Sequence, residues 1–357
     1  MGGVTTLINP LYTEHEIGHQ LKDAGARLLV TVPQFIEKAR AAAKLAGIAE
    51  IVVFGECDGA TPFAALLEND GEAPPVEINP RADLVALPYS SGTTGLPKGV
   101  MLTHYNLVAN ISQMKGLDYF TDDDTLIAVL PLFHIYGLMV VLNSGLHAGA
   151  TIVTIPRFEL ESFLKAIDDY GVTLAHIVPP IVIALSKNPI VDNYNLSKLK
   201  TIFSGAAPLG EELTRACMER VKCGIRQGYG LTETSPVTHS SPADPGQVKF
   251  GSVGVCAPGT ECKVIDLATG AAQGPNNEGE ICVRGPQVMK GYLKQPEATA
   301  RTVCAPMSRP PRHPWLLRRL LPDPAETLVD RLHNLLELLF VLGAAHGLRL
   351  GHAGPLG

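Results

Sequence analysis

Residues 89–99 read YSSGTTGLPKG, a short stretch that concentrates hydroxyl groups, glycines and one lysine. It follows an apolar run at 84–88 that predicts a strand, and it precedes a helix expected from about 104. Glycines let backbone N–H groups approach an anion, hydroxyls add further donors, and Lys98 adds a positive charge. The stretch therefore predicts a loop that holds a triphosphate or a leaving pyrophosphate. It is not a Walker A loop, because Pro97 precedes Lys98 where that motif requires glycine.

Predicted strands and helices alternate on both sides of this loop, which is typical of an α/β protein. Thr13 and Glu16 form a capping-box pattern for a first helix that ends near Gly25. Strands are expected at 4–9, 27–32, 51–54, 84–89, 125–130, 150–155 and 173–178, and further helices at about 34–46, 104–115, 136–147 and 159–170. We predict an α/β region over 1–245, with two mixed or parallel sheets and flanking helices.

The character of the sequence changes twice after this region. Gly and Pro recur every few residues from 246, with short alternating apolar runs between them, which predicts a small β-barrel subdomain over 246–302. Residues 303–357 form a Leu-, Arg- and Pro-rich tail. An amphipathic helix near 325–342 could pack on the domain, contact a partner protein or lie on a membrane surface. The preferred interpretation of the tail is a divergent or aberrant end.

Composition excludes several classes of protein. The 357 residues are 46% hydrophobic and 18% charged, with a net charge of −6, so a disordered chain and non-specific nucleic-acid binding are both disfavoured. The seven cysteines form no CxxC pair, which favours a reducing compartment. No signal peptide and no apolar run of about 18 residues is found. We expect a cytoplasmic protein without a transmembrane segment, and the final residues GPLG are no peroxisomal address.

Four further strings follow the loop in a fixed order. They read PLFHIYG at 131–137, SGAAPLG at 204–210, QGYGLTET at 227–234 and GEICVRG at 279–285, with Gly291-Tyr292 after the last. In this order the motifs resemble those of the AMP-forming adenylating enzymes, which include acyl-CoA synthetases, beetle luciferases and peptide-synthetase adenylation domains. Within this family, the residues of the motifs are most similar to those of 4-coumarate–CoA ligases and their relatives. The resemblance runs from about residue 1 to 302.

The resemblance implies an ATP-dependent acid–CoA ligase that forms acyl-AMP from a small carboxylic acid and then a CoA thioester. It implies catalytic roles for Lys98, His134, Thr232 and Glu233. Glu233 and Thr94 would bind Mg²⁺, a hard cation that prefers oxygen ligands. Tyr229 offers a flat face for adenine. The residues implied for ATP or AMP are Ser90, Ser91, Gly92, Thr93, Thr94, Gly95, Lys98, Gly205, Ala206, Ala207, Gln227, Gly228, Tyr229, Gly230 and Thr232.

The acyl pocket implied by the resemblance is less specific than the nucleotide site. Small residues at 204–207 leave room for an aromatic ring or for the start of an acyl chain, so a hydroxycinnamate-like acid and a medium- or long-chain fatty acid both fit. His134 is expected to line this pocket rather than to act as a base, because a carboxylate is already ionised at neutral pH. The residues expected at the pocket are His134, Ile135, Tyr136, Ser204, Gly205, Ala206, Ala207, Ser235, Pro236 and Val237.

A second motif points to different chemistry. Residues 15–19 read HEIGH, which matches the HExxH signature of zinc proteases. Glu16 already completes the capping box, however, and Gly18 weakens the helix that the motif needs. We therefore expect His15 and His19 to face solvent without a metal.

The resemblance fails beyond residue 302. The chain contains no TGD motif, and its last lysine is Lys294, whereas the family continues with a ribose-binding Asp, a hinge and a C-terminal domain that carries a catalytic lysine. The family also begins well upstream of Val4, so we expect uncovered apolar surface. The sequence thus predicts a ligase-derived chain of impaired activity. The alternatives are an adenylate-binding regulatory isoform without catalysis and a product that does not fold stably.

Overall fold

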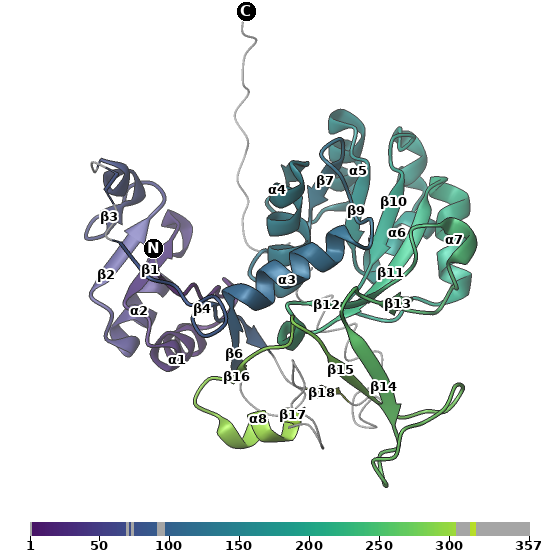
Figure 1. The fold of residues 1–357 in the computed structure, drawn as a ribbon. Coiled ribbons are helices and arrows are strands. Elements are labelled where there is room, and N and C mark those ends of the chain that lie inside the picture. The colour runs from purple at the N-terminus through teal and green to yellow at the C-terminus, as the bar shows by residue number, and fades with distance from the viewer. Residues whose placement is uncertain (1, 69–70, 73–74, 91–96, 305–314, 319–357) are drawn as a thin grey trace, which may run out of the picture.

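The computed structural model describes residues 2–68, 71–72, 75–90, 97–304 and 315–318, and these residues form a mixed α/β molecule with four sheets (Figure 1). This confirms the predicted fold class. Most of the expected helices and strands are present with ends shifted by one or two residues. The amphipathic helix expected near 325–342 lies outside the described residues.

The N-terminal residues form a lobe of their own, at the left in Figure 1. Its three strands pair in parallel, and the two helices bury Ile17, Leu21 and Ala42 against them. The capping box of Thr13 and Glu16 is confirmed at the start of the first helix. The lobe consists of α1 (Glu14–Ala24), β1 (Leu28–Thr31), η1 (Pro33–Phe35), α2 (Ile36–Ala46), β2 (Glu50–Val53), β3 (Thr61–Pro62) and η2 (Phe63–Leu67).

The largest sheet has seven strands in the order β13-β12-β11-β10-β9-β7-β8. Its strands from β11 to β8 run parallel, whereas β12 and β13 are antiparallel additions at one edge. Parallel strands place their carboxyl ends along one edge, where α/β proteins bind ligands. The strands are β7 (Thr125–Ala128), β8 (Thr151–Thr154), β9 (Leu174–Ile177), β10 (Thr201–Ser204), β11 (Gly224–Gly230), β12 (Val237–Ser240) and β13 (Val255–Cys256).

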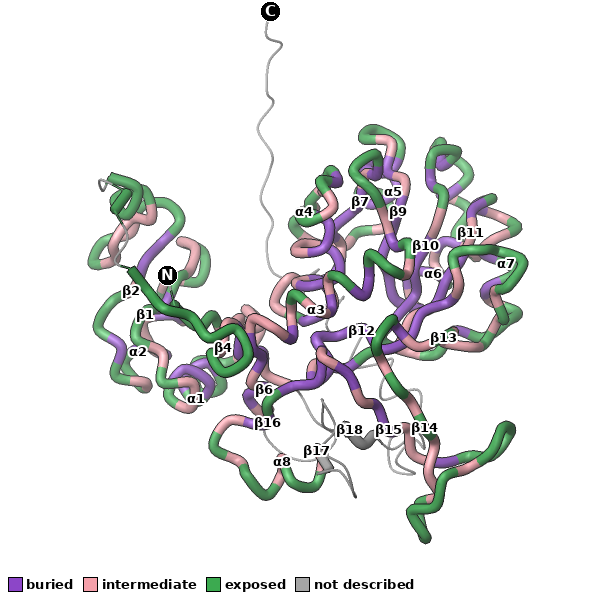
Figure 2. The backbone as a smooth tube through the Cα atoms, viewed as in Figure 1, coloured by how far each residue is buried: buried purple, intermediate pink, exposed green. Residues whose placement is uncertain are grey.

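Helices cover both faces of this sheet, and alternate residues of each strand point to opposite sides. On β10, Ile202 belongs to the core beneath α5, α6 and α7, whereas Phe203 belongs to the core beneath α3 and η3. Figure 2 shows buried residues concentrated in these strands. The helical segments are α3 (His104–Lys115), η3 (Tyr136–Asn143), α4 (Ser144–Ala148), α5 (Leu160–Tyr170), α6 (Pro179–Lys187), η4 (Pro189–Asn193), α7 (Glu211–Val221), η5 (Thr232–Thr234) and η6 (Pro245–Gln247).

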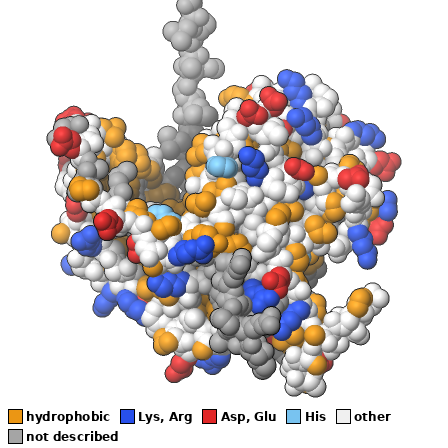
Figure 3. All heavy atoms as spheres, viewed as in Figure 1, with side chains coloured by type: hydrophobic (Ala, Val, Ile, Leu, Met, Phe, Trp, Pro, Cys, Tyr) orange, Lys and Arg blue, Asp and Glu red, His pale blue; other side chains and the backbone are white. Residues whose placement is uncertain are grey.

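The surface carries mixed charge. On the face drawn in Figure 3, Lys and Arg side chains are interspersed with Asp and Glu. This agrees with the net charge of −6 and gives no continuous basic patch on that face for a nucleic acid. Among the described residues, no helix is both long and apolar enough to cross a membrane.

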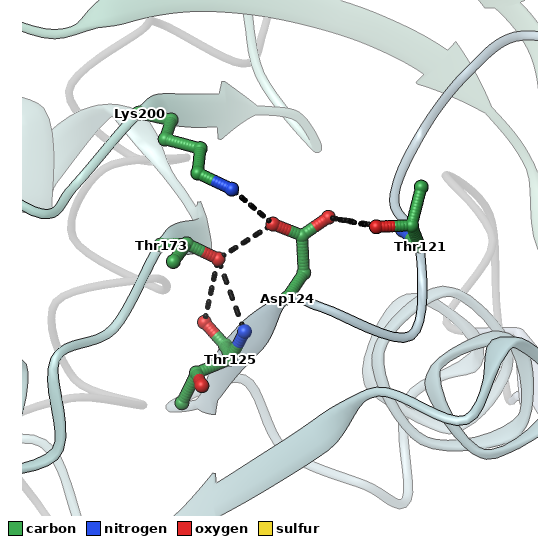
Figure 4. Close-up of polar contacts among 5 residues, drawn as sticks. All are labelled: Thr121, Asp124, Thr125, Thr173 and Lys200. Carbon is green, nitrogen blue, oxygen red and sulfur yellow. Dashed lines mark hydrogen bonds and ion pairs between the residues drawn. The ribbon is translucent and has the colours of Figure 1, made fainter.

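Asp124 ties together three strands of the large sheet at their amino ends (Figure 4). Its carboxylate accepts hydrogen bonds from Thr121 N at 2.9 Å and Thr173 Oγ1 at 2.8 Å, and it pairs with Lys200 Nζ at 3.1 Å. Thr173 in turn accepts a hydrogen bond from Thr125 N at 3.0 Å. Since these residues immediately precede β7, β9 and β10, the cluster fixes the relative positions of the strands whose opposite ends form the candidate site.

Two smaller antiparallel sheets complete the fold. In one, β6 (Lys98–Thr103) pairs with β4 (Leu84–Ala86), β5 (Tyr89–Ser90) and β16 (Gly291–Tyr292). In the other, β14 (Glu261–Ile265), β15 (Glu280–Arg284), β18 (Trp315–Arg318) and β17 (Val303–Cys304) follow in order, next to α8 (Pro296–Thr302).

Two expectations about strands need correction. The strands of 246–302 are distributed over three sheets, because β13 joins the large sheet and β16 joins β6, so the small barrel is not confirmed. The strand expected at 4–9 is wrong: within this stretch Thr5 forms an isolated bridge to Ala86. A run of apolar and β-branched residues shows that a strand is possible, but it does not identify the partner strand.

Candidate functional site

Three segments that are far apart in the sequence meet at Tyr292. Its hydroxyl donates to Glu233 Oε1 at 2.8 Å, and the Nζ atom of Lys98 lies 5.3 Å from the centre of its ring. The strand pairing of β16 with β6 places Tyr292 opposite Val100, two residues beyond Lys98. Met289 N donates to Glu233 O at 2.8 Å and fixes the backbone of η5 at the same place. The lysine of the predicted phosphate loop and the predicted metal-binding carboxylate are thus brought together by a tyrosine.

Glu233 provides a fit test for the magnesium ion that the motif implies. The residue is only 5% exposed, and no basic side chain among the described residues forms an ion pair with it. A buried carboxylate requires compensation by hydrogen bonds, a counter-charge or a metal. The tyrosine hydroxyl supplies one hydrogen bond to Oε1, and hard carboxylate oxygen is what Mg²⁺ prefers. Glu233 therefore fits a Mg²⁺ ligand, whereas Thr94 lies outside the described residues.

The QGYGLTET string forms the end of β11 and the turn into η5. Its pairing with β12 is interrupted by a register shift between Tyr229 and Gly230. At Gly230 an added Cβ would lie 2.2 Å from the carbonyl oxygen of Pro236, so this close approach requires glycine. The bulge leaves Gly230 exposed and Tyr229 and Thr232 half-buried at the carboxyl end of the strand. A half-buried aromatic ring and a hydroxyl at such an edge can contact a base and a phosphate.

The SGAAPLG string forms the turn after β10, beside the end of β11. Leu209 N donates to the side-chain oxygen of Gln227 at 3.3 Å, which links this turn to the QGYGLTET strand. Ala206 has a φ of +69°, a left-handed conformation that is costly for a residue with a side chain. A Cβ at Gly205 would lie 2.9 Å from the ring of Tyr136, so glycine permits that ring to pack on the turn.

His134 lies on an exposed turn that ends in a π-helix, η3. Its Nδ1 accepts a hydrogen bond from Tyr136 N at 3.2 Å, so a neutral ring carries its proton on Nε2. A Cβ at Gly137 would lie 2.4 Å from the carbonyl oxygen of Pro131, which makes this turn specific to glycine. The expected regular helix at 136–147 is therefore a π-helix followed by the short α4, and such wide turns often occur at functional sites.

Several residues expected at the acyl pocket belong to the interior. Ile135 and Ser204 are 2% exposed, Ser235 is fully buried and Val237 is 6% exposed. Ser235 Oγ donates to Gln287 O at 2.9 Å, so its hydroxyl has a structural partner. Pro236 and Gly205 are buried as well, whereas His134 and Ala206 are exposed and Tyr136 and Ala207 are half-buried. The structure thus packs the half-buried ring of Tyr136 on the turn at Gly205, and it keeps the buried residues of the predicted pocket in the interior.

The phosphate loop is described only at its two ends. Ser90 pairs with Lys98 in an antiparallel ladder, so β5 and β6 hold the ends of the loop next to each other. Tyr89 OH donates to Asp23 Oδ2 at 2.7 Å and anchors β5 to α1. The predicted ligands Ser91, Gly92, Thr93, Thr94 and Gly95 lie outside the described residues.

Two residues of this region have no role in the sequence-based predictions. Tyr292 was named only as part of the Gly291-Tyr292 pair that follows the last string, although an aromatic residue directly after glycine was a usable signal. The second is His176, which is fully buried on β9 and for which neither nitrogen has a hydrogen-bond partner among the described residues. Its ring stacks on Phe203 with centroids 4.8 Å apart, and Arg226 covers that phenyl ring at 4.7 Å. Burial, with a smaller effect of Arg226, lowers the pKa of His176 to about 3, so the ring stays neutral.

Among the described residues, the HExxH side chains are not gathered as a group of metal ligands. His15 and His19 are exposed, and Glu16 accepts hydrogen bonds from both N and Oγ1 of Thr13. Those hydrogen bonds lower the pKa of Glu16, which agrees with its role in capping the helix. The prediction that both histidines face solvent is confirmed.

The described residues thus combine a parallel sheet, Gly-containing turns at its carboxyl edge and a buried carboxylate close to Lys98. The family model "AMP-binding enzyme" matches residues 1–293, and the chain belongs to this family. It is 43% identical to 4-coumarate–CoA ligase 3 of rice (Oryza sativa subsp. japonica) over 85% of this chain and 56% of that protein. It is 45% identical to 4-coumarate–CoA ligase 1 of potato (Solanum tuberosum) over 85% and 57%. The chain thus spans a little over half the length of these relatives.

Solved structures agree with the sequence comparison. A long-chain-fatty-acid-CoA ligase from Archaeoglobus fulgidus superposes with a TM-score of 0.80 at 27% identity, over 94% of this chain and 69% of that one. ATP-bound MatB from Rhodopseudomonas palustris superposes with a TM-score of 0.74 at 31% identity, over 84% and 58%. The described residues therefore have the fold of acyl- and aryl-CoA ligases.

Proposed function

We propose that the chain binds ATP and a small carboxylic acid at the carboxyl edge of the large sheet and serves carboxylate adenylation. In this reaction a carboxylate oxygen attacks the α-phosphorus, the bond to the β-phosphate breaks, and acyl-AMP and pyrophosphate form. A CoA thiol would then attack the acyl carbonyl and release AMP. The observation that carries the proposal is the contact of Tyr292 with both Glu233 and Lys98, because it supports a role for Glu233 in metal binding close to the lysine of the predicted phosphate loop.

The chemistry of each side chain suggests its role in the proposed reaction. Lys98, Ser90 and the loop residues Ser91, Gly92, Thr93, Thr94 and Gly95 would hold the pyrophosphate. Tyr229 would stack on adenine next to the turn of Gly205, Ala206 and Ala207, and Thr232 would donate to the α-phosphate. When bound by Glu233, Mg²⁺ offsets the negative charge of the phosphate oxygens. His134 and Tyr136 would face the acyl group.

The proposed acid is a hydroxycinnamate-like aromatic carboxylate. The ring of Tyr136 packs on Gly205 and is partly exposed, which offers a flat surface to an aromatic substrate. The 4-coumarate–CoA ligases to which the chain is 43–45% identical support the same substrate class. A fatty acid is the second candidate, because of the structural similarity to the long-chain ligase.

Calorimetry with a non-hydrolysable acyl-adenylate analogue tests the nucleotide site. We expect the double variant Tyr229→Ala/Thr232→Ala to bind about 5- to 150-fold more weakly, because stacking on a base contributes about 1–3 kcal/mol. Tyr170→Ala is the matched control, since Tyr170 is an exposed tyrosine at the end of α5. Equal affinity of the double variant, or no binding by the folded wild type, would contradict the proposal.

Two extensions of this titration separate the finer parts of the proposal. Coumaroyl and decanoyl analogues distinguish an aromatic from an aliphatic acid, and we expect tighter binding of the coumaroyl compound. Glu233→Gln should abolish the gain in ATP affinity on adding Mg²⁺, yet bind the metal-free adenylate analogue as the wild type does. A thioester assay of the same preparation distinguishes a ligase from a chain that binds adenylates without turnover.

A further inference from the structure

Three potential metal ligands lie together at the edge of the large sheet, outside the adenylation site. The imidazole of His239 on β12, the thiol of Cys256 on β13 and the thiol of Cys262 on β14 place their ligand atoms within 4.8 Å of one another. His239 is 7% exposed, and both cysteines are half-buried. This is the one group of three such side chains found among the described residues.

The backbone brings the three residues together from different strands. His239 and Cys256 stand directly opposite each other in the β12–β13 ladder, so their side chains share one face of the sheet. The chain then turns back, with Thr260 N donating to Ala257 O at 2.9 Å, and enters β14 at Glu261, so Cys262 is the second residue of that strand. Gln113 of α3 donates to Pro258 O at 2.9 Å and holds this turn in place.

Hydrogen bonds orient the imidazole and decide which nitrogen faces the thiols. Thr238 Oγ1 donates its single proton to the carbonyl oxygen of Tyr229 at 3.1 Å. Toward His239 Nδ1, at 2.9 Å, the same hydroxyl oxygen can then only accept, so Nδ1 carries the ring proton. The lone pair of Nε2 therefore points to Cys256 Sγ, 3.3 Å away. An imidazole whose other nitrogen is held by an oxygen is the usual arrangement around a metal ligand.

We propose that His239, Cys256 and Cys262 form a binding site for Zn²⁺, with a water molecule as the fourth ligand. Bond lengths of about 2.3 Å to sulfur and about 2.0–2.1 Å to nitrogen give an N···S edge of about 3.5 Å in a tetrahedral site. The distance of 3.3 Å between Nε2 and Cys256 Sγ is close to this value, so little movement is needed. Two thiolates and one imidazole are soft to borderline ligands that suit zinc and disfavour Mg²⁺ and Ca²⁺.

Binding couples to the ionisation of both thiols. A cysteine thiol has an ordinary pKa of about 8.5, so both thiols carry their protons at neutral pH when no metal is bound. Zinc binding must release both thiol protons, and the affinity for zinc rises with pH.

The position of the site gives it a structural effect on the nucleotide region. The ring of His239 lies 6.0 Å from the ring of Tyr229, and Thr238 bonds to both residues. A metal at this position would cross-link β12 and β13 to β14, directly behind the tyrosine proposed to stack on adenine. The proposal does not depend on adenylate binding, since it rests on the three side chains alone.

A cobalt titration of the 357-residue chain tests the site, because Co²⁺ reports thiolate ligands by a sulfur-to-metal charge-transfer band. The chain is purified under reducing conditions and freed of chelator. We expect one equivalent of Co²⁺ to produce the band, zinc to displace it, and about two protons to be released. Zinc should also raise the Tm, because it binds the folded state.

Cys256→Ser and Cys262→Ser should each lose the band, whereas Cys57→Ser, a half-buried cysteine in the N-terminal lobe, should keep it. Absence of the charge-transfer band in the wild-type protein would by itself overturn the proposal. Loss of the band in Cys57→Ser would also overturn it. The intact mass of the protein after metal addition is a further check. A loss of two hydrogens would show that Cys256 and Cys262 have formed a disulfide instead of binding the metal, and this result would also overturn the proposal.

Discussion

The hydroxyl group of Tyr292 donates a hydrogen bond to the buried carboxylate of Glu233. Removing this hydroxyl group tests the centre of the candidate site. We expect Tyr292→Phe to lower the free energy of unfolding by about 1–3 kcal/mol, because Glu233 Oε1 then loses its 2.8 Å partner inside the protein. Tyr194→Phe is the matched control, since Tyr194 OH donates to Glu161 Oε1 at 3.4 Å on the surface and should matter by less than about 0.5 kcal/mol. Urea unfolding measures both, and equal effects would contradict the role of Tyr292.

Asp124 makes a pH-dependent contribution at the opposite end of the sheet. Burial raises its pKa, but hydrogen bonds from Thr121, Thr173 and Lys200 outweigh this and hold the pKa below its ordinary value. A carboxyl with a lowered folded-state pKa stabilises the protein above its unfolded pKa, about 3.9, and this stabilisation is lost as pH falls through the folded value. Thermal unfolding between pH 7 and pH 3 should therefore show a smaller acid-dependent loss in Asp124→Asn than in the wild type.

The same variant also changes stability at neutral pH. Asp124→Asn should cost about 1–3 kcal/mol at pH 7, mostly through the hydrogen bonds to Thr121 and Thr173. The Lys200 side chain is 61% exposed, so its ion pair adds little. If Asp124→Asn had the same Tm as the wild type at pH 7, this would contradict the proposed role of Asp124 in holding β7, β9 and β10 in position.

At the scale of elements, the bulge at the end of β11 shapes the site. Gly230→Ala should destabilise the protein by about 1–3 kcal/mol and weaken adenylate binding, because its Cβ would lie 2.2 Å from Pro236 O. Gly210→Ala is the control, since a Cβ there meets no atom within 4 Å and the residue precedes α7. Wild-type stability and affinity in Gly230→Ala would show that the bulge is not required.

The individual helices and strands could be predicted from the sequence more completely than the pairing and packing between them. Apolar periodicity gave α3 and α5 because it reflects a local repeat, and the Thr13–Glu16 pair gave the start of α1. The π-helix η3 was missed, since its wide turn depends on the contact of Gly137 with Pro131 rather than on periodicity.

In the candidate site, too, the local motifs could be predicted from the sequence, whereas the contacts between distant residues could not. The strings at 89–99 and 227–234 predicted a lysine loop and a strand-to-turn edge, which are local features. The contact of Tyr292 with Glu233 joins residues 59 positions apart and depends on how β16 pairs with β6. The spacing of His239, Cys256 and Cys262 matches no familiar metal motif, so only the strand register reveals that they meet.

At the scale of the whole molecule, the N-terminal lobe leaves apolar surface uncovered. Leu28 and Val30 on β1 are 43% and 45% exposed, whereas the opposite face of the same strands packs on α1 and α2. The large sheet, in contrast, has helices on both faces, so the proposed site lies on the better packed part of the chain.

Hydrogen–deuterium exchange of the whole chain, with and without the acyl-adenylate analogue, tests the central claim most directly. We predict slower exchange in β11 and η5 (Gly224–Thr234) and in the paired strands β6 and β16, with no change in α5 (Leu160–Tyr170). Protection of these segments together would show that one ligand engages the edge where Tyr229, Glu233 and Lys98 meet. Unchanged exchange at saturating analogue, or protection confined to other elements, would contradict the assignment of this edge as an adenylate site.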